Sequence, residues 1–569
     1  MGITRNCLLG AGVGAGALLT LLGSCFVVYW PDIFDAVLNK ELALSEDSRS
    51  FGLWEVTPIP LYIEFYFFNW TNEQDLKTPG TKPIFEELGP YVFREHRRKV
   101  IHAWNHNNET VTFRQNRTWE FDPSLSKGTL DDNVTTINIP AVAAAFSCRH
   151  CGGFTKFMLN EAINALGTRL YVTKKVREFL FEGYTDPLLD LAQLIPKGLA
   201  PVSIPFDKFG WFYTRNGSAD YDGIFNMRTG VRDIQNLGVL ANWDYRSQTP
   251  FYESYCGRVN GSAGEFFPPN RDKTKISLFS PDICRTLDLN YKEEIQVNGI
   301  NGYRYWGDDK MFANQTQCPD NWCWCPAGEC PPHGALDVST CKWGAPAFIS
   351  FPHFYHADQS YRDAVVGMHP VEEKHQMFID LEPRSGIPLQ VAASFQINIL
   401  LQPTKEYTLL HDVPKIYFPT VWFKQTARID DKIGPELAIL TALPGAGTII
   451  SFVVLSLGVT CLLVIAIFYL TRRCFKDDET FHGLPVTYPF TKNLGYRHKD
   501  VCCAIRNKLS GRVQPSSIVT ISNGSRIPHF AIPINNNLPE IISNATRRGV
   551  SPVRFQCDND DEERSPLYS

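Results

Sequence analysis

The sequence predicts a mixed α+β membrane protein, in which one large ectodomain of mainly antiparallel β structure is held between two terminal transmembrane helices. Two charge-free apolar runs near the ends of the 569-residue chain predict the helices. Short β-prone runs separated by Gly and Asn turns fill most of the region between them. The composition, with 44% hydrophobic and 20% charged residues, excludes collagen-like, heptad-repeat and fully disordered chains.

The first apolar run covers residues 8–30, after a short N-terminal segment of residues 1–7. At a rise of about 1.5 Å per residue, a helix of this length spans a hydrocarbon core roughly 30 Å thick. The run contains no Asp, Glu, Lys or Arg. A cleaved signal peptide is the alternative, because the small residues Gly23 and Ser24 resemble a processing site.

Alternating glycines in the first run form two overlapping GxxxG spacings: Gly10, Gly12, Gly14 and Gly16. This spacing lets a neighbouring helix approach closely, so we expect these residues to pack against the second span. The alternative interpretation is that these glycines have no packing role, because transmembrane helices tolerate glycine.

The second apolar run covers residues 443–470 and is followed at once by a basic cluster at residues 472–476. Arg5 precedes the first run, and acidic residues follow it. Acidic residues also precede the second run. Because positively charged flanks stay in the cytosol, we expect both termini to be cytosolic and residues 31–442 to lie outside.

Asn-x-Ser/Thr sequons support this orientation, because such sites are glycosylated only on the lumenal side. Seven lie between the two runs: Asn69, Asn108, Asn116, Asn133, Asn216, Asn260 and Asn314. Two more, Asn523 and Asn544, follow the second run and are expected to stay unmodified.

Nine of the 16 cysteines lie between the runs, and five of them fall between Cys318 and Cys341. Their spacing lacks the second CxxC or His pair that a zinc site needs, so extracellular disulfides are the better interpretation. An odd number requires at least one free or intermolecular thiol. Cys148 and Cys151 form a CxxC pair, for which a redox function is the alternative to a structural bridge.

Helical periodicity interrupts the β pattern between residues 154 and 187. Apolar residues recur there at helical spacing, which predicts an amphipathic helix in two segments, broken near Gly167 and ended by Asp186 and Pro187. Four basic residues in this segment are candidates for ligand binding: Arg169, Lys174, Lys175 and Arg177. The alternative is an ordinary helical hairpin with a solvated basic face.

The sequence contains neither a Gly-x-Ser-x-Gly elbow nor a Walker loop. Four histidines raise the question of a metal site: His353, His356, His369 and His375. They lack the glutamate-bearing HExxH pattern, so a structural role is favoured. We therefore expect no enzyme activity, no catalytic residue, no metal ion, no cofactor and no nucleic-acid partner.

Seven segments carry a family resemblance: EELGPYVFREHRRK (86–99), TTINIPAVAAA (135–145), FGWFYTRNGSADYDG (209–223), VNGSAGEFFPP (259–269), SPDICR (280–285), GAPAFISFPHFYHAD (344–358) and GMHPVEEKHQMFIDLEPRSG (367–386). With the two terminal helices and the cysteine cluster, they resemble the class B scavenger receptor family. This family includes fatty-acid translocase, the high-density-lipoprotein receptor and a lysosomal integral membrane protein. The resemblance extends from residue 8 to about residue 470.

The resemblance implies a β-barrel-like ectodomain with a helical apex at residues 154–187 and a hydrophobic tunnel toward the bilayer. It implies a receptor that binds lipoproteins or lipids and transfers sterol, fatty acid or phospholipid to the membrane. The implied location is the plasma membrane or the endosome–lysosome membrane. The alternative is an endolysosomal trafficking or phagocytic recognition receptor, whose apex binds a protein or a cell surface.

The resemblance also implies three disulfides: Cys256 with Cys323, Cys284 with Cys341, and Cys325 with Cys330. Three further cysteines fall outside the family pattern. One hypothesis is that Cys148 pairs with Cys151 and leaves Cys318 free.

The C-terminal segment, residues 471–569, lacks clear periodicity and is predicted to be a disordered cytosolic tail. Cys474, beside the membrane, is a candidate for palmitoylation, with a reduced thiol as the alternative. The end of the tail resembles an acidic dileucine sorting signal, in which Glu563 stands four residues before Leu567 and Tyr568 replaces the second Leu or Ile. We expect this signal to bind sorting adaptors.

Overall fold

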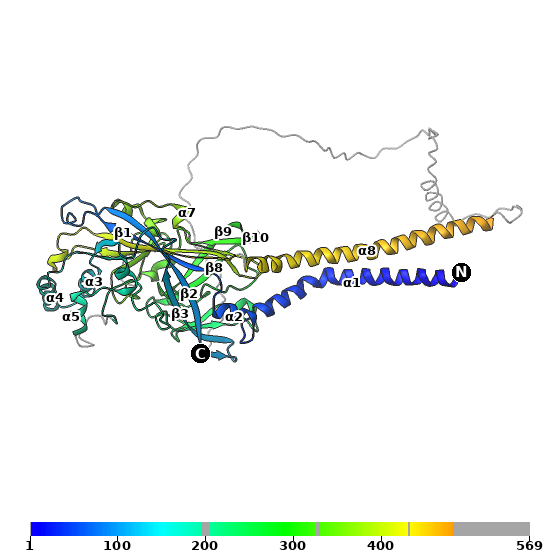
Figure 1. Cartoon of the computed structure of the whole chain (residues 1–569), viewed down its shortest axis with the longest axis horizontal. Helices are drawn as coiled ribbons and strands as arrows, with labels where there is room; N and C mark the ends of the chain where they lie inside the picture. Colours follow the sequence, from blue (N-terminus) through cyan, green and yellow to red (C-terminus); the bar gives the residue numbers. More distant parts are fainter. Residues whose placement is uncertain (1, 195–204, 326–329, 431–432, 482–569) are drawn as a thin grey trace, which may run out of the picture. The chain divides into compact units, whose positions relative to one another are not determined.

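The computed structural model describes residues 2–194, 205–325, 330–430 and 433–481. These described residues divide into two compact units, residues 2–31 with 445–481 and the described part of residues 32–444. The first unit contains two long helices, and the second is a strand-rich body with short helices (Figure 1). The predicted mixed α+β class is confirmed.

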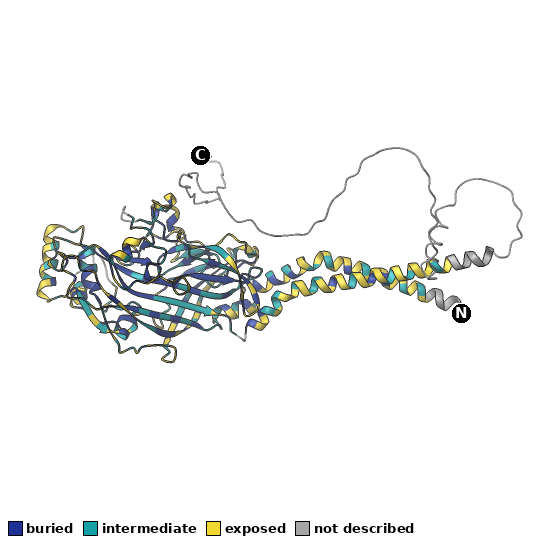
Figure 2. Ribbon diagram, turned by 90° about the horizontal axis from the view of Figure 1, so that it is seen from above, coloured by how far each residue is buried: buried dark blue, intermediate teal, exposed yellow. Residues whose placement is uncertain are grey.

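The two long helices are α1 (Gly2–Leu42) and α8 (Gly434–Phe481). Both are long and apolar enough to cross a membrane, over Leu8–Leu42 and Gly434–Arg473. Their apolar side chains face outward over much of their length (Figure 2). A stretch of this kind is stable in hydrocarbon, where a helix satisfies its own backbone hydrogen bonds.

Glycines bring the two helices into close contact. A Cβ atom on Gly12 would lie 3.0 Å from Ile465, and one on Gly16 would lie 2.9 Å from Leu462. Gly10 and Gly14, by contrast, have open space around them. Only one of the two overlapping GxxxG spacings therefore faces α8.

Helix α1 does not end at Trp30, the predicted end of the first span, but continues to Leu42. Phe34, Leu38 and Leu42 are buried at spacing i, i+4 and i+8, which places them on one face of the helix. This last part of α1 therefore packs into the second unit, to which it belongs.

A 13-stranded, largely antiparallel sheet forms the second unit, with strand order β7-β6-β3-β2-β1-β15-β14-β13-β10-β9-β8. Its bounds are β1 (Leu61–Trp70), β2 (Phe85–Asn105), β3 (Thr110–Phe121), β6 (Phe225–Arg228), β7 (Leu240–Trp243), β8 (Lys275–Ser280), β9 (Arg285–Val297), β10 (Ile300–Trp306), β13 (Phe378–Leu381), β14 (Pro388–Leu401) and β15 (Ile416–Arg428). A branch of β11 (Ala335–Asp337) and β12 (Ala347–Ser350) pairs with β14.

One bridging residue nearly closes the sheet into a barrel. Ser262 pairs with Val239, just before β7, and also with Leu278 of β8 at the other end of the strand order. The Ser262 N–H donates to Ser277 O at 2.9 Å, and Phe279 N–H donates to Ser262 O at 2.8 Å. Closure of this kind leaves few unpaired edge groups.

Short helices complete the second unit: α2 (Arg49–Glu55), α3 (Ile139–Ser147), α4 (Gly153–Ala165), α5 (Pro187–Leu194), α6 (Gln359–Asp363) and α7 (Glu372–His375). Helices α3, α4 and α5 gather at one end of the sheet (Figure 1). This end is called the apex below.

The prediction of a second helical segment after Gly167 is wrong. Helix α4 ends before Gly167, which has a φ of 63° and so stops the helix. Tyr171–Lys175 then forms strand β5, which pairs with β4 (Asn133–Ile137). The β-branched residues Val172 and Thr173 favour this extended pairing over a helix. Helical structure returns only in the short turn Glu178–Glu182.

Candidate functional site

An apolar cavity of about 1240 Å³ lies between helices α3, α4 and α5 and strands β14 and β15. It is larger than most small-molecule pockets, which occupy roughly 300–1000 Å³. Aliphatic and aromatic side chains make up most of its wall. Such a wall favours an apolar ligand, so the cavity is the candidate functional site of the second unit.

One face of helix α4 lines the cavity. Thr155, Met158, Leu159 and Ala162 follow the spacing i, i+3, i+4 and i+7, which puts their side chains on the same side of the helix. Ala144 of helix α3 lies on the same wall, and its small side chain leaves room for a ligand.

Strands β14 and β15 form the opposite wall. Phe395, Ile397 and Ile399 alternate along β14, so their side chains point to one face of the sheet. Phe423 of β15 pairs directly with Phe395 and adds a second aromatic ring to this wall, with ring centroids 6.2 Å apart.

A patch of charged side chains interrupts the apolar wall. The Arg215 guanidinium donates to Asp222 at 2.9 Å and lies 2.9 Å from Asp282, and Lys342 lines the same part of the cavity. Burial alone would raise the pKa of Asp282, but Arg215, Arg117 and Lys342 outweigh burial and hold that pKa well below its usual range. The carboxylate of Asp282 is therefore ionised at neutral pH.

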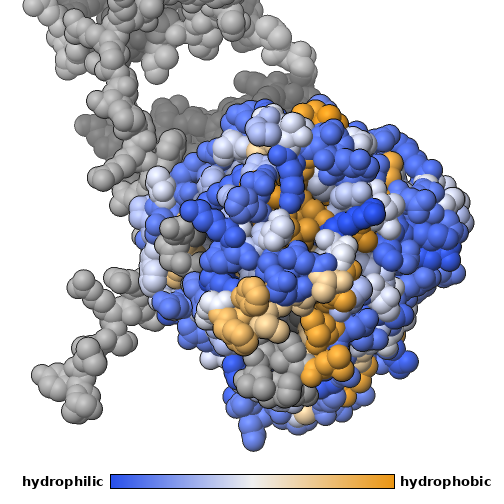
Figure 3. Space-filling view, turned by 90° about the vertical axis from the view of Figure 1, so that its left-hand side faces the viewer, coloured by the Kyte–Doolittle hydropathy of each residue, from blue (hydrophilic) through white to orange (hydrophobic). Residues whose placement is uncertain are grey.

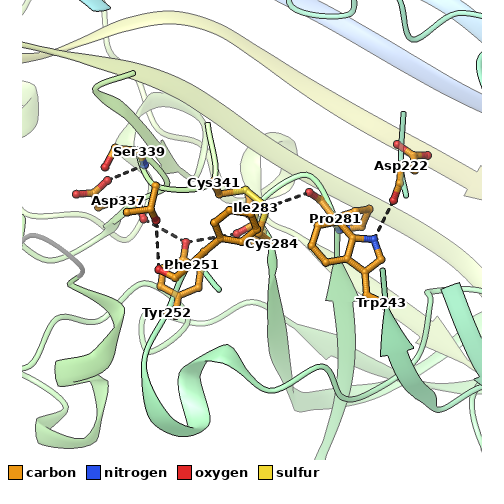
Figure 4. Close-up of a disulfide and its surroundings, with 11 residues drawn as sticks. Asp222, Trp243, Phe251, Tyr252, Pro281, Ile283, Cys284, Asp337, Ser339 and Cys341 are labelled. Carbon is orange, nitrogen blue, oxygen red and sulfur yellow. Dashed lines mark hydrogen bonds between the residues drawn. A yellow bond between two sulfur atoms is a disulfide. The ribbon is translucent and has the colours of Figure 1, made fainter. Parts of the chain in front are cut away.

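The Cys284–Cys341 disulfide holds the two sides of this patch together (Figure 4). Asp282 lies two residues before one cysteine, and Lys342 directly follows the other. Both cysteines and both charged residues line the cavity. The covalent bond thereby fixes Asp282 and Lys342 as neighbours in the cavity wall.

Hydrogen bonds hold the segments around the disulfide in place (Figure 4). The Tyr252 hydroxyl donates to the carbonyl oxygen of Asp337 at 3.2 Å, and the Asp337 carboxylate accepts from Ser339 N–H at 2.8 Å. Trp243 Nε1 donates to the carbonyl oxygen of Asp222 at 2.9 Å. These bonds immobilise the segments that carry the charged patch.

A network of buried ion pairs continues from this patch through the barrel interior. Arg97 lies 2.6 Å from Glu95 and 2.9 Å from Glu265, and Lys99 lies 2.5 Å from Glu265. Burial lowers the pKa of Lys99 to about 8, although Glu265 attracts its charge. Arg117 connects this group to the patch through Glu95 at 3.9 Å and Asp222 at 2.9 Å.

The sequence did not reveal this network. Glu95, Arg97 and Lys99 occupy alternate positions of β2 and point inward, whereas Arg94, directly before them, and Arg98, between Arg97 and Lys99, are exposed. Because both faces of the strand are charged here, alternation of polarity cannot identify the inner one. Only the folded sheet shows which of these charged side chains have buried ion-pair partners.

The structure contains the other cysteine pairs that the resemblance implies, Cys256–Cys323 and Cys325–Cys330. It also joins Cys148 to Cys151. Cys318 is disulfide-bonded as well, so the hypothesis of a free thiol at this position is wrong.

The four candidate basic residues do not form one positive surface. Lys175 and Arg177 both pair with Asp131, at 2.8 and 2.5 Å, and Lys174 lies over the Tyr184 ring. Arg169 is exposed. None of the four lines the cavity. The surface carboxylate of Asp131 therefore neutralises part of their charge.

The apex instead presents exposed apolar side chains. Phe154, Phe157 and Met158 of α4 are 77%, 58% and 51% exposed, and Leu194 of α5 is 78% exposed. Hydrophobic residues gather on the molecular face at this end (Figure 3). Met158 also lines the cavity, so the exposed group continues into the cavity wall.

Two of the four histidines, His353 and His375, pack together in the protein interior. His353 Nε2 lies 2.6 Å from Glu87, and the His353 ring stacks on His375 with centroids 4.5 Å apart. Burial, with the neighbouring His353, lowers the pKa of His375 to about 3. Within the described residues, no group of three or more His, Cys, Asp or Glu side chains is arranged to hold a metal ion.

The seven sequons between the spans differ in accessibility. Asn108, Asn133, Asn216 and Asn260 are exposed. The remaining three are half-buried: Asn69, Asn116 and Asn314.

Several predicted features of the tail lie outside the described residues, namely Glu563, Leu567, Asn523 and Asn544. Cys474 falls within the range of α8, but its side chain is likewise outside the described part.

Comparison with known proteins gives one family match and several relatives. The model of the CD36 family matches residues 14–469. The chain is 36% identical over 485 residues to Protein peste of Drosophila melanogaster, covering 84% of this chain and 85% of that protein. It is 32% identical over 466 residues to Scavenger receptor class B member 1 of Bos taurus, covering 81% and 89%. It is 31% identical over 429 residues to Lysosome membrane protein 2 of Mus musculus, covering 75% and 87%.

Proposed function

The chain belongs to the CD36 family, and on that basis we propose that it is a receptor that takes lipid from a lipoprotein or another lipid particle and passes it through the apical cavity toward the membrane. The cavity of about 1240 Å³ beside the exposed apolar residues of α4 is the observation that carries this proposal. A lipid that leaves a particle at α4 would enter the cavity directly along its apolar wall.

The physical advantage of such a route is the avoidance of water. Exposing a hydrocarbon chain to water costs about 0.8 kcal/mol per CH₂ group. An apolar passage removes most of that cost without any chemical step, so the proposed function needs no catalytic residue, metal ion or cofactor.

The proposed topology follows the charge pattern at the two spans. Residues 1–7 and 471–569 lie in the cytosol, and the glycosylated, disulfide-bonded residues 31–442 lie outside or in a lumen. The protein functions in the plasma membrane, the endosome–lysosome membrane or both, and the signal at Glu563 and Leu567 binds sorting adaptors.

A cavity-filling substitution tests the proposal. Ala144→Trp places an indole among the cavity residues of α3, whereas Ala103→Trp adds the same group at an exposed position of β2. Cells that express each full-length variant are given lipoproteins with a labelled lipid and a labelled protein. We expect A144W to reduce lipid uptake about tenfold while particle binding persists, and A103W to change neither. Uptake by A144W equal to that of the unsubstituted protein would refute the proposal.

The exposed apex favours a second candidate function, recognition of a protein or cell-surface ligand for endolysosomal trafficking or phagocytosis. Its support is the group of exposed side chains that includes Phe154, Phe157 and Leu194, together with the similarity to a lysosome membrane protein. The double variant F154S/F157S would then abolish ligand binding, and A144W would have no effect on it.

A further inference from the structure

The Cys148–Cys151 disulfide lies at the junction between helices α3 and α4. Its cysteines are 3 residues apart in sequence, whereas those of the Cys256–Cys323 bridge are 67 residues apart. The stabilising effect of a disulfide grows with the length of the loop that it closes. The bridge at the junction therefore stabilises the fold less than Cys256–Cys323 does, and its position between two helices of the cavity wall becomes its main property.

The two sulfur atoms of this bridge have different surroundings. Cys148 is only 2% exposed, whereas Cys151 is half-buried. Cys151 stands directly before Gly152, the N-cap of α4, which gives the first N–H groups of that helix no side-chain cap. The positive end of a helix stabilises a thiolate, and Arg149 and His150 add exposed basic groups beside it. A small thiol can therefore reach Cys151, and Cys151 is a good leaving group.

Two glycines follow the bridge and form a joint. A Cβ atom on Gly152 or Gly153 would meet nothing within 4 Å, so no neighbouring group restricts the chain at this point. Glycine also permits the widest range of backbone angles. The disulfide is therefore the covalent constraint on a joint that is otherwise free to turn.

Helix α4 is held to the rest of the unit mainly at its surface. Ile163 is the only buried residue of this helix, which the structure describes in full. Lys156 Nζ lies 3.0 Å from Glu406, and Asn160 accepts from Thr408 N–H at 2.8 Å. Glu406 and Thr408 are exposed, and surface contacts of this kind contribute little stability. Because the inner face of α4 lines the cavity, a displacement of this helix changes access to the cavity.

We propose that Cys148–Cys151 is a thiol–disulfide exchange site, at which thiols of low molecular weight open the bridge and release α4 as a lid over the cavity. This inference goes beyond the proposed lipid function, because it assigns redox control to the lid whatever the cavity binds.

The exchange uses two small thiol molecules and transfers two electrons. The thiolate of the first molecule attacks Cys151 Sγ, the S–S bond breaks, and Cys148 Sγ leaves with the electron pair and takes up a proton. The thiolate of the second molecule attacks the small-molecule sulfur of the mixed disulfide, and Cys151 leaves as a thiolate beside α4. Both protein sulfurs are thereby reduced, and the two small thiols are oxidised to one disulfide.

Reduction of the full-length chain in detergent micelles tests the exchange site. The protein is equilibrated with reduced and oxidised glutathione at graded ratios, free thiols are blocked with N-ethylmaleimide, and mass spectrometry measures the reduced fraction of each pair. We expect Cys148–Cys151 to be half-reduced at a ratio about tenfold lower than the buried Cys256–Cys323 pair requires, because accessible disulfides with a stabilised thiolate are the labile ones. Equal resistance of the two pairs would overturn the exchange site.

Hydrogen exchange of the same samples tests the lid. Opening the bridge with glutathione should speed the exchange of amides in Gly153–Ala165 about tenfold and leave peptides of β14 unchanged. The double variant C148S/C151S should show the faster exchange without glutathione. The matched control C325S/C330S removes another short bridge, with a sequence separation of 5 and neither cysteine in the cavity wall, and should leave α4 unchanged.

Exchange in α4 that is equal in the oxidised and the reduced chain would overturn the lid. The glutathione measurement decides this on the unsubstituted protein, so the result does not depend on how well either variant folds.

Discussion

Arg215 joins two parts of the chain that are far apart in sequence, because it pairs with Asp222 in its own loop and with Asp282 before the disulfide. The Arg215 and Asp222 side chains are only 6% and 3% exposed. A buried charge that loses its partner is strongly destabilising, whereas an exposed one is not.

We therefore predict that Arg215→Met lowers the free energy of unfolding of the second unit by about 3–5 kcal/mol. Arg232→Met is the matched control, since Arg232 is 74% exposed and pairs with Glu109 at the surface. The control should cost less than about 1 kcal/mol. Thermal unfolding of both variants, followed by tryptophan fluorescence, makes the comparison, and equal stability of the two would contradict the importance of the buried pairs.

The buried carboxylates also predict an acid dependence. The pKa values of Glu95, Glu265 and Asp282 are lowered in the folded protein, because ion pairs with arginine and lysine outweigh burial. A lowered folded-state pKa gives stability that is present above the unfolded-state pKa of about 4 and is lost as the pH falls through the folded-state value. Unfolding measured from pH 6 to pH 3 should therefore show a decline below about pH 4. Asp282→Asn should make that decline shallower, and an unchanged slope would argue against the assigned pKa shift.

At the scale of elements, sequence patterns predicted apolar helices and many strands but not every boundary. The 3.6-residue period correctly predicted α4, whereas the basic segment after Gly167 forms strand β5. In that short segment helical and extended patterns are hard to distinguish, and pairing with β4 decides the outcome. The cavity was beyond sequence patterns, because its wall combines α3, α4, β14 and β15.

The glycines of α1 give a prediction with an internal control. A Cβ atom on Gly23 would lie 2.5 Å from the backbone nitrogen of Leu455, whereas one on Gly14 would meet nothing within 4 Å. Gly23→Leu should therefore force α1 and α8 apart and lower the melting temperature of the full-length chain in micelles by several degrees. Gly14→Leu should leave it unchanged. Similar melting temperatures for the two variants would contradict the observed helix register.

At the scale of the whole molecule, the two charge-free runs and the family segments predicted most of the architecture. The antiparallel sheet, the terminal helices and family membership are confirmed. The charged patch in the cavity wall was not predictable from the sequence, because Arg215 and Asp282 come together only in the folded chain.

Glycosylation tests the proposed topology. We expect glycans at the exposed sequons Asn108, Asn133, Asn216 and Asn260 and none at Asn523 or Asn544 in the tail. Peptide N-glycosidase treatment in heavy-oxygen water, followed by mass spectrometry, marks each occupied site. A glycan on either tail sequon would place the tail in the lumen and contradict a cytosolic C-terminus.

The most direct test of the central claim, that lipid occupies the apical cavity, is to map where a photoactivatable fatty acid reacts with the full-length chain. The account predicts labelled peptides from α3, α4 and β14, with labelling lost in A144W. Labelling confined to the two long apolar helices α1 and α8 would contradict it.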